Sequence, residues 1–143
     1  MPSFESKLSE VVIRHIPGCT ELIAVERLSG GASQETYRLT LAIGDQEVLM
    51  AMRRSPGGEF VEPVAARPGL DVEAMLMRAA KAVDVPEPEV YYLLRREDDL
   101  GDGFIMQWLE GEALGARIVR SPDYKVVRLG LARECGRILA RIH

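Results

Sequence analysis

A two-residue alternation over residues 36–43, in which Ala42 is the one apolar side chain on the otherwise polar face, constrains this chain more than any other feature of its sequence. Successive side chains of an extended chain point to opposite faces, so the segment predicts a half-buried strand. Its apolar face consists of Tyr37, Leu39, Leu41 and Ile43. Gly44-Asp45 favours a tight turn into a strand over residues 47–53, and residues 21–28 have the same extended character. The three segments predict an antiparallel meander.

Helical periodicity occurs on both sides of this meander. Residues 4–16 carry apolar side chains at helical spacing, with Ser3 suited to cap the start and Pro17-Gly18 to end the helix. Residues 55–69 are rich in proline and glycine and predict an exposed loop. A second helix is predicted over residues 72–83, and its expected buried stripe consists of Val72, Met75, Leu76, Ala79 and Val83.

Two more strands and a last helix complete the pattern. Strands are predicted over residues 90–94 and 104–109, and Gly111 and Gly115 flank a flexible link. Ser121-Pro122 suits the first turn of the last helix. Its apolar stripe consists of Val127, Leu131, Cys135, Ile138, Leu139 and Ile142. The stripe meets no stop signal, so we expect the natural chain to continue into further structure.

The order helix, three strands, helix, two strands, helix predicts an α+β fold with a five-stranded antiparallel sheet. The 143 residues suffice for one domain or one lobe of a larger one. A net charge of −4 gives no overall footprint for nucleic acid. The apolar runs are shorter than the ~20 residues that a membrane span needs. Without a signal peptide, and with Cys19 and Cys135 expected as free thiols, a cytoplasmic location is predicted. Two histidines are too few for a histidine-based metal site.

A glycine-rich loop lies between the first two predicted strands. It consists of Leu28, Ser29, Gly30, Gly31, Ala32, Ser33 and Gln34. Glycines let backbone N–H groups approach phosphate oxygens closely, and the two serines add hydroxyl donors. A hairpin that binds nothing has a similar sequence, so the loop alone leaves both interpretations open.

Three further features strengthen the interpretation as a phosphate site. Ala51 and Arg53 fall on one face of the third strand, where a small residue leaves room for a flat base and a cation can reach phosphates. Glu73 lies where its carboxylate can pair with Arg53. The strand over residues 104–109 exits into Glu110-Gly111 and can offer backbone groups to an adenine edge. Each feature taken singly also fits a plain structural role, as a solvated cation, a helix-dipole carboxylate or a core strand.

In order and spacing, these motifs resemble the N-terminal lobe of the aminoglycoside phosphotransferase family, the small-molecule kinases of protein-kinase-like fold. The similar segments are LSGGASQETY (28–37), MAMRRSP (50–56), DVEAML with Glu73, VDVPEPEV (83–90), FIMQWLEG (104–111) and LARECGRILARIH (131–143). The resemblance divides the chain into a nucleotide-binding lobe over residues 1–110, followed over residues 111–143 by a hinge and the first helix of a truncated C-terminal lobe.

The resemblance implies an ATP site. Backbone amides of Gly30 to Gln34 would cover the phosphates, and Arg53 would contact the α- and β-phosphates while paired with Glu73. The base would be held by residues that line its pocket or bond its edge. These are Ala51 in the pocket, Met106 at the gatekeeper position, the Gln107 carbonyl and Leu109 amide at the adenine edge, and Leu28 and Tyr37 packed nearby.

The chain also departs from the family's pattern. Gln34 stands for the usual asparagine, Arg53 for lysine and Gln107 for glutamate. The catalytic loop H-x-D-x-x-x-x-N and the metal-binding aspartate motif are not found in these 143 residues. We therefore expect no catalytic residue and no metal ligand in this chain, with Mg²⁺ bound only when the second lobe is present, and this chain alone inactive.

Two hypotheses follow. In the first, the chain is the ATP-binding lobe of a phosphotransferase that moves the γ-phosphate to a hydroxyl of a small-molecule acceptor. The family's acceptors include aminoglycosides, choline, fructosamine, homoserine and methylthioribose, and the RRSP strand end looks most like the branch fused to acyl-CoA dehydrogenases. In the second, the chain is a non-catalytic half-kinase that binds a partner or forms a homodimer through its last helix, whose apolar stripe would be exposed.

Overall fold

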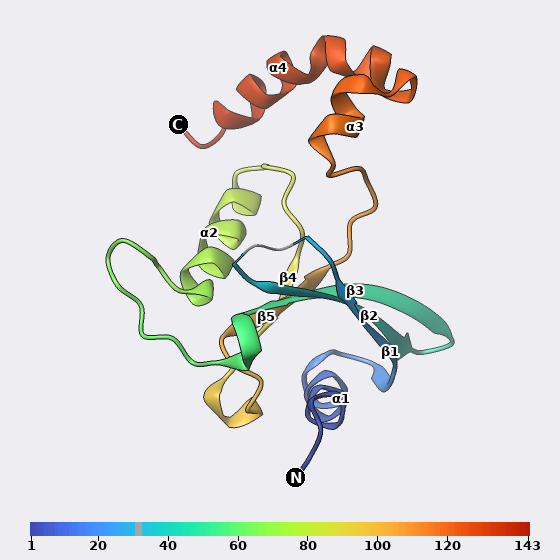
Figure 1. The fold of residues 1–143 in the computed structure, drawn as a ribbon, viewed down its shortest axis with the longest axis vertical. Coiled ribbons are helices and arrows are strands. Elements are labelled where there is room, and N and C mark those ends of the chain that lie inside the picture. The colour runs from blue at the N-terminus through green and yellow to red at the C-terminus, as the bar shows by residue number, and fades with distance from the viewer. Residues whose placement is uncertain (31–32) are drawn as a thin grey trace.

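The computed structural model describes residues 1–30 and 33–143, and within them it has four α-helices and five strands (Figure 1). The helices are α1 (Phe4–His15), α2 (Leu70–Ala82), α3 (Gly115–Arg120) and α4 (Lys125–Leu139). The strands are β1 (Cys19–Leu28), β2 (Glu35–Ile43), β3 (Gln46–Arg54), β4 (Val90–Leu93) and β5 (Gly103–Gln107). The predicted α+β class and element order are confirmed.

All five strands form one antiparallel sheet in the order β1-β2-β3-β5-β4. The β2–β3 ladder runs without a bulge from the pair Glu35–Arg54 to the pair Ile43–Gln46. Gly44 closes this hairpin at φ +59°, a conformation that glycine adopts without strain. The meander predicted from the alternation is therefore present, with β3 at the centre of the sheet.

The sheet separates two apolar cores. On one face, Leu39, Leu41 and Met52 pack against α1, whose Leu8 and Val12 are fully buried. On the other face, a smaller core joins the sheet to α2, and it consists of Ala51, Leu70, Ala74, Val90, Phe104 and Met106. Figure 1 shows α1 below the sheet and α2 on the opposite side. The alternation over residues 36–43 is thus the signature of a strand whose apolar side faces α1.

The first helix has the predicted limits. The Ser3 hydroxyl accepts a hydrogen bond from the Ser6 N–H at 3.1 Å and caps the helix start. The Ile16 N–H closes the other end on the Val12 carbonyl at 3.0 Å. The His15 ring stacks on Tyr92 with centroids 4.3 Å apart, which gives this histidine a structural contact.

The buried stripe predicted for the second helix is wrong. The helix begins at Leu70, and Leu70 and Ala74 are its buried residues. Met75 and Leu76 are each 57% exposed. The helix carries more apolar side chains than one sheet face can cover, and the sheet selects the line through Leu70 and Ala74. Leu76 and other apolar side chains of α2, though not Met75, border a groove that also touches Ile142 after α4.

The C-terminal segment differs from the prediction at its start. A short helix that was not predicted, α3, begins at Gly115, the second glycine of the expected link. Ser121 caps a 3₁₀ turn over Pro122–Tyr124, and α4 follows from Lys125. The guanidinium of Arg128 donates to the carbonyls of Ile118 and Ser121, both at 2.7 Å, and ties α3 to α4.

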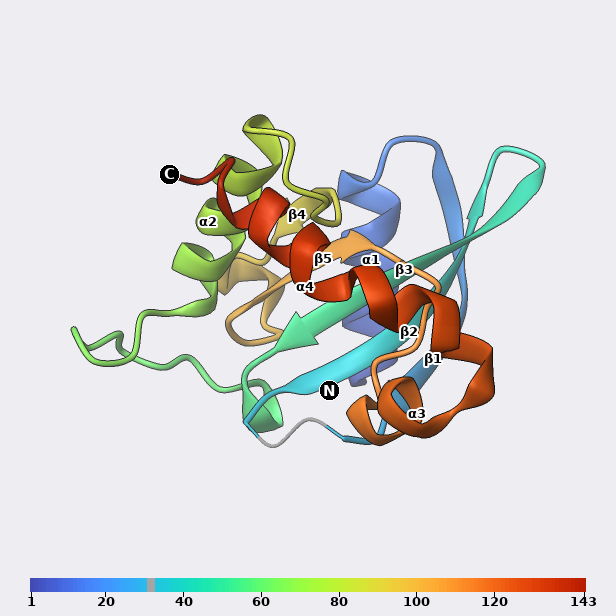
Figure 2. The same cartoon turned by 90° about the horizontal axis from the view of Figure 1, so that it is seen from above.

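The helix α4 crosses above the sheet face that carries α2, as seen from above in Figure 2. Arg141, just after α4, donates to the Asp84 carbonyl at the end of α2. No residue of α4 is buried, and Val127, Leu131 and Leu139 of its apolar stripe are exposed. Within residues 1–30 and 33–143, no helix is long and apolar enough to cross a membrane.

Candidate functional site

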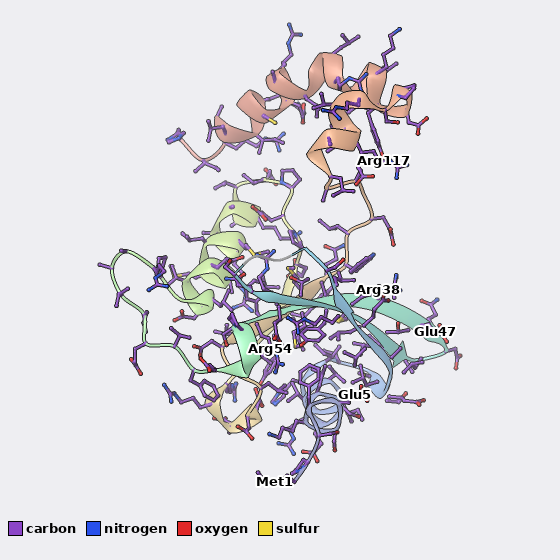
Figure 3. The ribbon with its side chains drawn as sticks, in the orientation of Figure 1. Met1, Glu5, Arg38, Glu47, Arg54 and Arg117 are labelled. Carbon is purple, nitrogen blue, oxygen red and sulfur yellow. The ribbon has the colours of Figure 1, made fainter. Side chains whose placement is uncertain are left out.

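Predicted site residues from separate segments share the sheet face that carries α2. Directly paired residues of neighbouring strands point to the same face. The register aligns one row across β1, β2, β3 and β5, consisting of Leu28, Thr36, Arg53 and Phe104. The next row consists of Arg38, Ala51 and Met106. In Figure 3, Arg38 lies on the side of the sheet that faces α3 and α4.

The predicted ion pair between Arg53 and Glu73 is present. Arg53 Nη1 bonds Glu73 Oε1, and both side chains are 34% exposed. Glu73 is held in the first turn of α2, where its N–H donates to the Gly69 carbonyl at 3.2 Å. A guanidinium has five N–H donors, and in the described part of the chain Glu73 is the one group that Arg53 contacts by a hydrogen bond. The pair therefore orients Arg53 and leaves donors for an anion.

The glycine-rich loop connects the ends of β1 and β2 beside this row. Gly30 has φ +115°, a region that side-chain-bearing residues rarely adopt, and a Cβ there would meet nothing within 4 Å. Glycine is thus required at Gly30 by the backbone conformation and not by crowding. Ser29 and Ser33 are exposed, and Gln34 is half-buried. Gly31 and Ala32, which were also predicted to belong to the site, lie outside the described residues.

The exit of β5 provides backbone groups beside Ala51. Met106 is buried and shares the face of Ala51. Gln107 is fastened to Glu89, because its N–H donates to the Glu89 carbonyl at 2.7 Å and its side-chain oxygen accepts from the Glu89 N–H at 3.2 Å. Leu109 follows the strand end, and its N–H donates no hydrogen bond to any other described residue. Its side chain is 56% exposed.

Tyr37 does not join the other predicted residues. It pairs with Met52 in the ladder and therefore points to the α1 face, where its ring lies 5.0 Å from that of Phe4. Its hydroxyl donates to Glu35 at 2.7 Å. Tyr37 is thus part of the α1 core, and the strand behind it separates it from Ala51 and Arg53.

A buried ion pair that the sequence analysis missed lies behind the site. Glu35 is 8% exposed, and its Oε2 accepts from Arg54 Nε at 2.8 Å. Burial raises the pKa of Glu35, but hydrogen bonds from Tyr37, the Gly57 N–H and Arg54 outweigh burial and lower the pKa to about 2. One feature of the sequence indicates this pair, because the two-residue period of β2 places Glu35 on the same face as the buried positions of the strand.

A groove with a volume of about 640 Å³ runs along α2. Its lining includes Val72, Leu76 and Val83, and Ile142 closes one side. Among the predicted site residues that the structure describes, Glu73 alone borders it. Both cysteines are free thiols. In the part of the chain that the structure describes, no cluster of three or more His, Cys, Asp or Glu side chains is placed to hold a metal ion.

The geometry brings a glycine loop, a carboxylate-held arginine, a small strand residue and an open strand exit to one sheet face. The sequence profile of the phosphotransferase enzyme family matches residues 24–143, which contain all of these features. No curated protein and no solved structure matches the chain. Since the profile covers most of the chain and the resemblance in sequence agrees with it, this chain belongs to the phosphotransferase enzyme family.

Proposed function

We propose that this chain is the ATP-binding lobe of a phosphotransferase that transfers the γ-phosphate to a hydroxyl of a small molecule. The Arg53–Glu73 ion pair carries the proposal, because it orients a cation beside the glycine-rich loop. A phosphoryl group leaves with little covalent help from the protein, so positioning and charge stabilisation of the phosphates dominate the reaction.

On the phosphate side, the amides of Gly30, Ser33 and Gln34 contact the phosphates, and Ser29 and Ser33 supply hydroxyl donors. Arg53 contacts the α- and β-phosphates through the donors that Glu73 leaves unused. Arginine in place of lysine offers a planar fork and not a point charge, which suits two oxygens of one phosphate.

On the base side, Ala51 leaves room for the flat ring, and Leu28 and Met106 border it on the same sheet face. The Leu109 N–H and the Gln107 carbonyl bond the adenine edge. The open N–H of Leu109 supports this assignment, since a buried base requires a partner for its ring nitrogen. Tyr37 has no role in this site.

ATP supplies the phosphoryl group when bound, and this chain's residues bind and orient it. We assign no residue here to the acceptor, to the catalytic base or to Mg²⁺.

A titration with a fluorescent ATP analogue, displaced by unlabelled ATP, tests the proposal. Arg53→Ala should weaken binding about tenfold or more, because a hydrogen bond to a charged group contributes roughly 1.5–3 kcal/mol. Arg96→Ala is the matched control, since it removes the same charge from a side chain that is 72% exposed at the β4–β5 connection. Equal affinity of Arg53→Ala and the wild type would refute the assignment.

A second candidate function is self-association as a homodimer through α4. The exposed stripe of α4 supports it, with Leu129 88% exposed. Charge favours a second copy of the chain as the partner. Residues 111–143 carry seven basic and three acidic side chains, whereas residues 1–110 carry eleven basic and nineteen acidic ones, so the two parts attract each other between copies.

Sedimentation velocity over a range of protein concentrations tests the dimer. Leu129→Glu should shift the species towards monomer, and added salt should do the same because it screens the attraction. Ile13→Glu is the control that should leave the dimer unchanged, because Ile13 lies on the exposed side of α1. A wild-type chain that stays monomeric at every concentration would contradict the idea.

A further inference from the structure

A network of hydrogen bonds around Glu35 and Arg54 joins four segments of the chain on the α1 face. Glu35 accepts hydrogen bonds from Tyr37 Oη at 2.7 Å, from Arg54 Nε at 2.8 Å and from the Gly57 N–H at 3.1 Å. Arg54 Nη1 donates in turn to the Leu100 carbonyl at 3.2 Å. The network therefore joins β2, β3, the 3₁₀ turn after β3 and the β4–β5 connection.

The guanidinium of Arg54 also lies over the ring of Phe4 in α1, at 4.3 Å from the ring centroid. Figure 3 shows Arg54 near the end of β3, on the same side of the sheet as Glu5 of α1. An aromatic ring below the guanidinium favours the cation and keeps water away from it. Glu35 is thus buried and satisfied in its hydrogen bonds, and the side chain of Arg54 is 13% exposed.

The position of the Glu35–Arg54 pair in the sheet links it to the candidate site. Glu35 and Arg54 are partners in the last step of the β2–β3 ladder. Glu35 directly follows the glycine-rich loop, and Arg54 directly follows Arg53. Since neighbouring residues of a strand point to opposite faces, locking Glu35 and Arg54 on one face fixes where Thr36 and Arg53 point on the other.

The ends of a strand pair open more readily than its middle, because they have fewer neighbours and exposed hydrogen bonds. Beyond Glu35 and Arg54 the chain leaves the sheet on both strands. Without an anchor, this end would fray and Arg53 would lose its fixed position relative to the loop. Removing one member of a buried charge pair leaves the other charge uncompensated, so a substitution of Glu35 or Arg54 should be felt at this end of the strands.

We propose that Glu35 and Arg54 are positioning residues that hold the start of β2 and the end of β3 together and so align Ser33 and Gln34, the last residues of the glycine-rich loop, with Arg53 for a phosphate-bearing ligand. This rests on the proposed function for the identity of the ligand. The alignment itself is a property of the ligand-free chain and is measured without ATP.

Hydrogen–deuterium exchange of the ligand-free chain tests the alignment. In Glu35→Gln, which keeps the side-chain shape and removes the charge, peptides spanning residues 28–34 and 53–58 should exchange about tenfold faster. Peptides from the middle of the β2–β3 hairpin should keep their rates. Lys7→Met is the matched control, because it breaks the ion pair with Asp99 and leaves the strand ends intact.

Unchanged exchange in residues 28–34 and 53–58, or equal acceleration along the whole hairpin, would overturn the proposal. The second result would mean a general loss of stability and no local alignment. Arg54→Lys is a milder variant in case Glu35→Gln does not fold. It keeps the charge, loses the planar fork and should produce the same local pattern with a smaller increase.

Titration with the fluorescent ATP analogue completes the test. Glu35→Gln should bind it about tenfold more weakly than the wild type, whereas Lys7→Met should bind it equally well. If the wild type binds no ATP and yet the local exchange pattern appears, the proposed function fails and the alignment of the loop with Arg53 stands. If the wild type binds ATP and Glu35→Gln binds it as tightly, the positioning role fails and the proposed function stands.

Discussion

Replacing Glu35 by glutamine should change how the stability of this protein depends on pH. The pKa of Glu35 lies at about 2 in the folded chain, against an ordinary value of 4.5. The difference is about 2.5, and each pKa unit corresponds to about 1.4 kcal/mol, so the ionised carboxylate stabilises the fold by about 3 kcal/mol at neutral pH. The side chain is 9% exposed, so solvent screens this contribution little.

The sign follows from the lowered pKa. Above pH 4.5 the carboxylate is ionised in both the folded and the unfolded chain, and the full stabilisation is present. As the pH falls from 4.5 towards 2, the unfolded chain takes up a proton more readily than the folded chain, and the stabilisation is lost. Total stabilities of single domains are about 5–15 kcal/mol, so the loss is measurable.

Urea unfolding at several pH values from 7 to 2.5 checks this prediction. The free energy of unfolding should be higher for the wild type than for Glu35→Gln at neutral pH, and the gap should narrow by about 3 kcal/mol towards pH 2. Glu47→Gln, on the exposed start of β3, is the control and should follow the wild type. A gap that stays constant over this pH range would refute the electrostatic reasoning.

The remaining predictions concern packing. Leu8→Ala should lower the free energy of unfolding by about 2–5 kcal/mol, because Leu8 is fully buried against the sheet. Met75→Ala should change the free energy of unfolding by less than about 0.5 kcal/mol, because Met75 is 57% exposed. Urea unfolding measures both variants, and a larger loss in Met75→Ala than in Leu8→Ala would contradict the two-core arrangement. Gly101→Ala should destabilise the fold by more than about 1 kcal/mol, since Gly101 has φ +90° and a Cβ would collide with the backbone of Gly58. If Gly101→Ala melts at the same temperature as the wild type, the close approach of Gly101 to Gly58 is unimportant for stability.

Most of the fold was predictable because its signals are local. The alternation over residues 36–43 and the turn at Gly44 specify a hairpin without reference to the rest of the chain. Ser3 and Pro17 likewise mark the limits of α1 through capping and through the loss of a backbone donor. Such signals depend on neighbours a few residues away, and the structure confirms them.

The candidate site was predictable in part, for a related reason. The two-residue spacing of Ala51 and Arg53 determines that they share a face, and Glu73 lies early enough in α2 to meet Arg53. Tyr37 illustrates where this reasoning ends. Its motif suggested a place beside a nucleotide, but its phase in β2 directs it to the α1 face, and the phase relative to Ala51 depends on the register between strands.

By itself, the sequence determined the element order, the antiparallel hairpin and the small set of candidate residues for a phosphate site, because these follow from periodicity, turns and spacing. The tertiary structure alone decided which apolar side chains of α2 are buried and that Glu35 meets Arg54 behind the site. Burial and pairing of this kind depend on which surfaces meet across the sheet. A helix with apolar residues on two sides has no preferred buried face until the sheet supplies one.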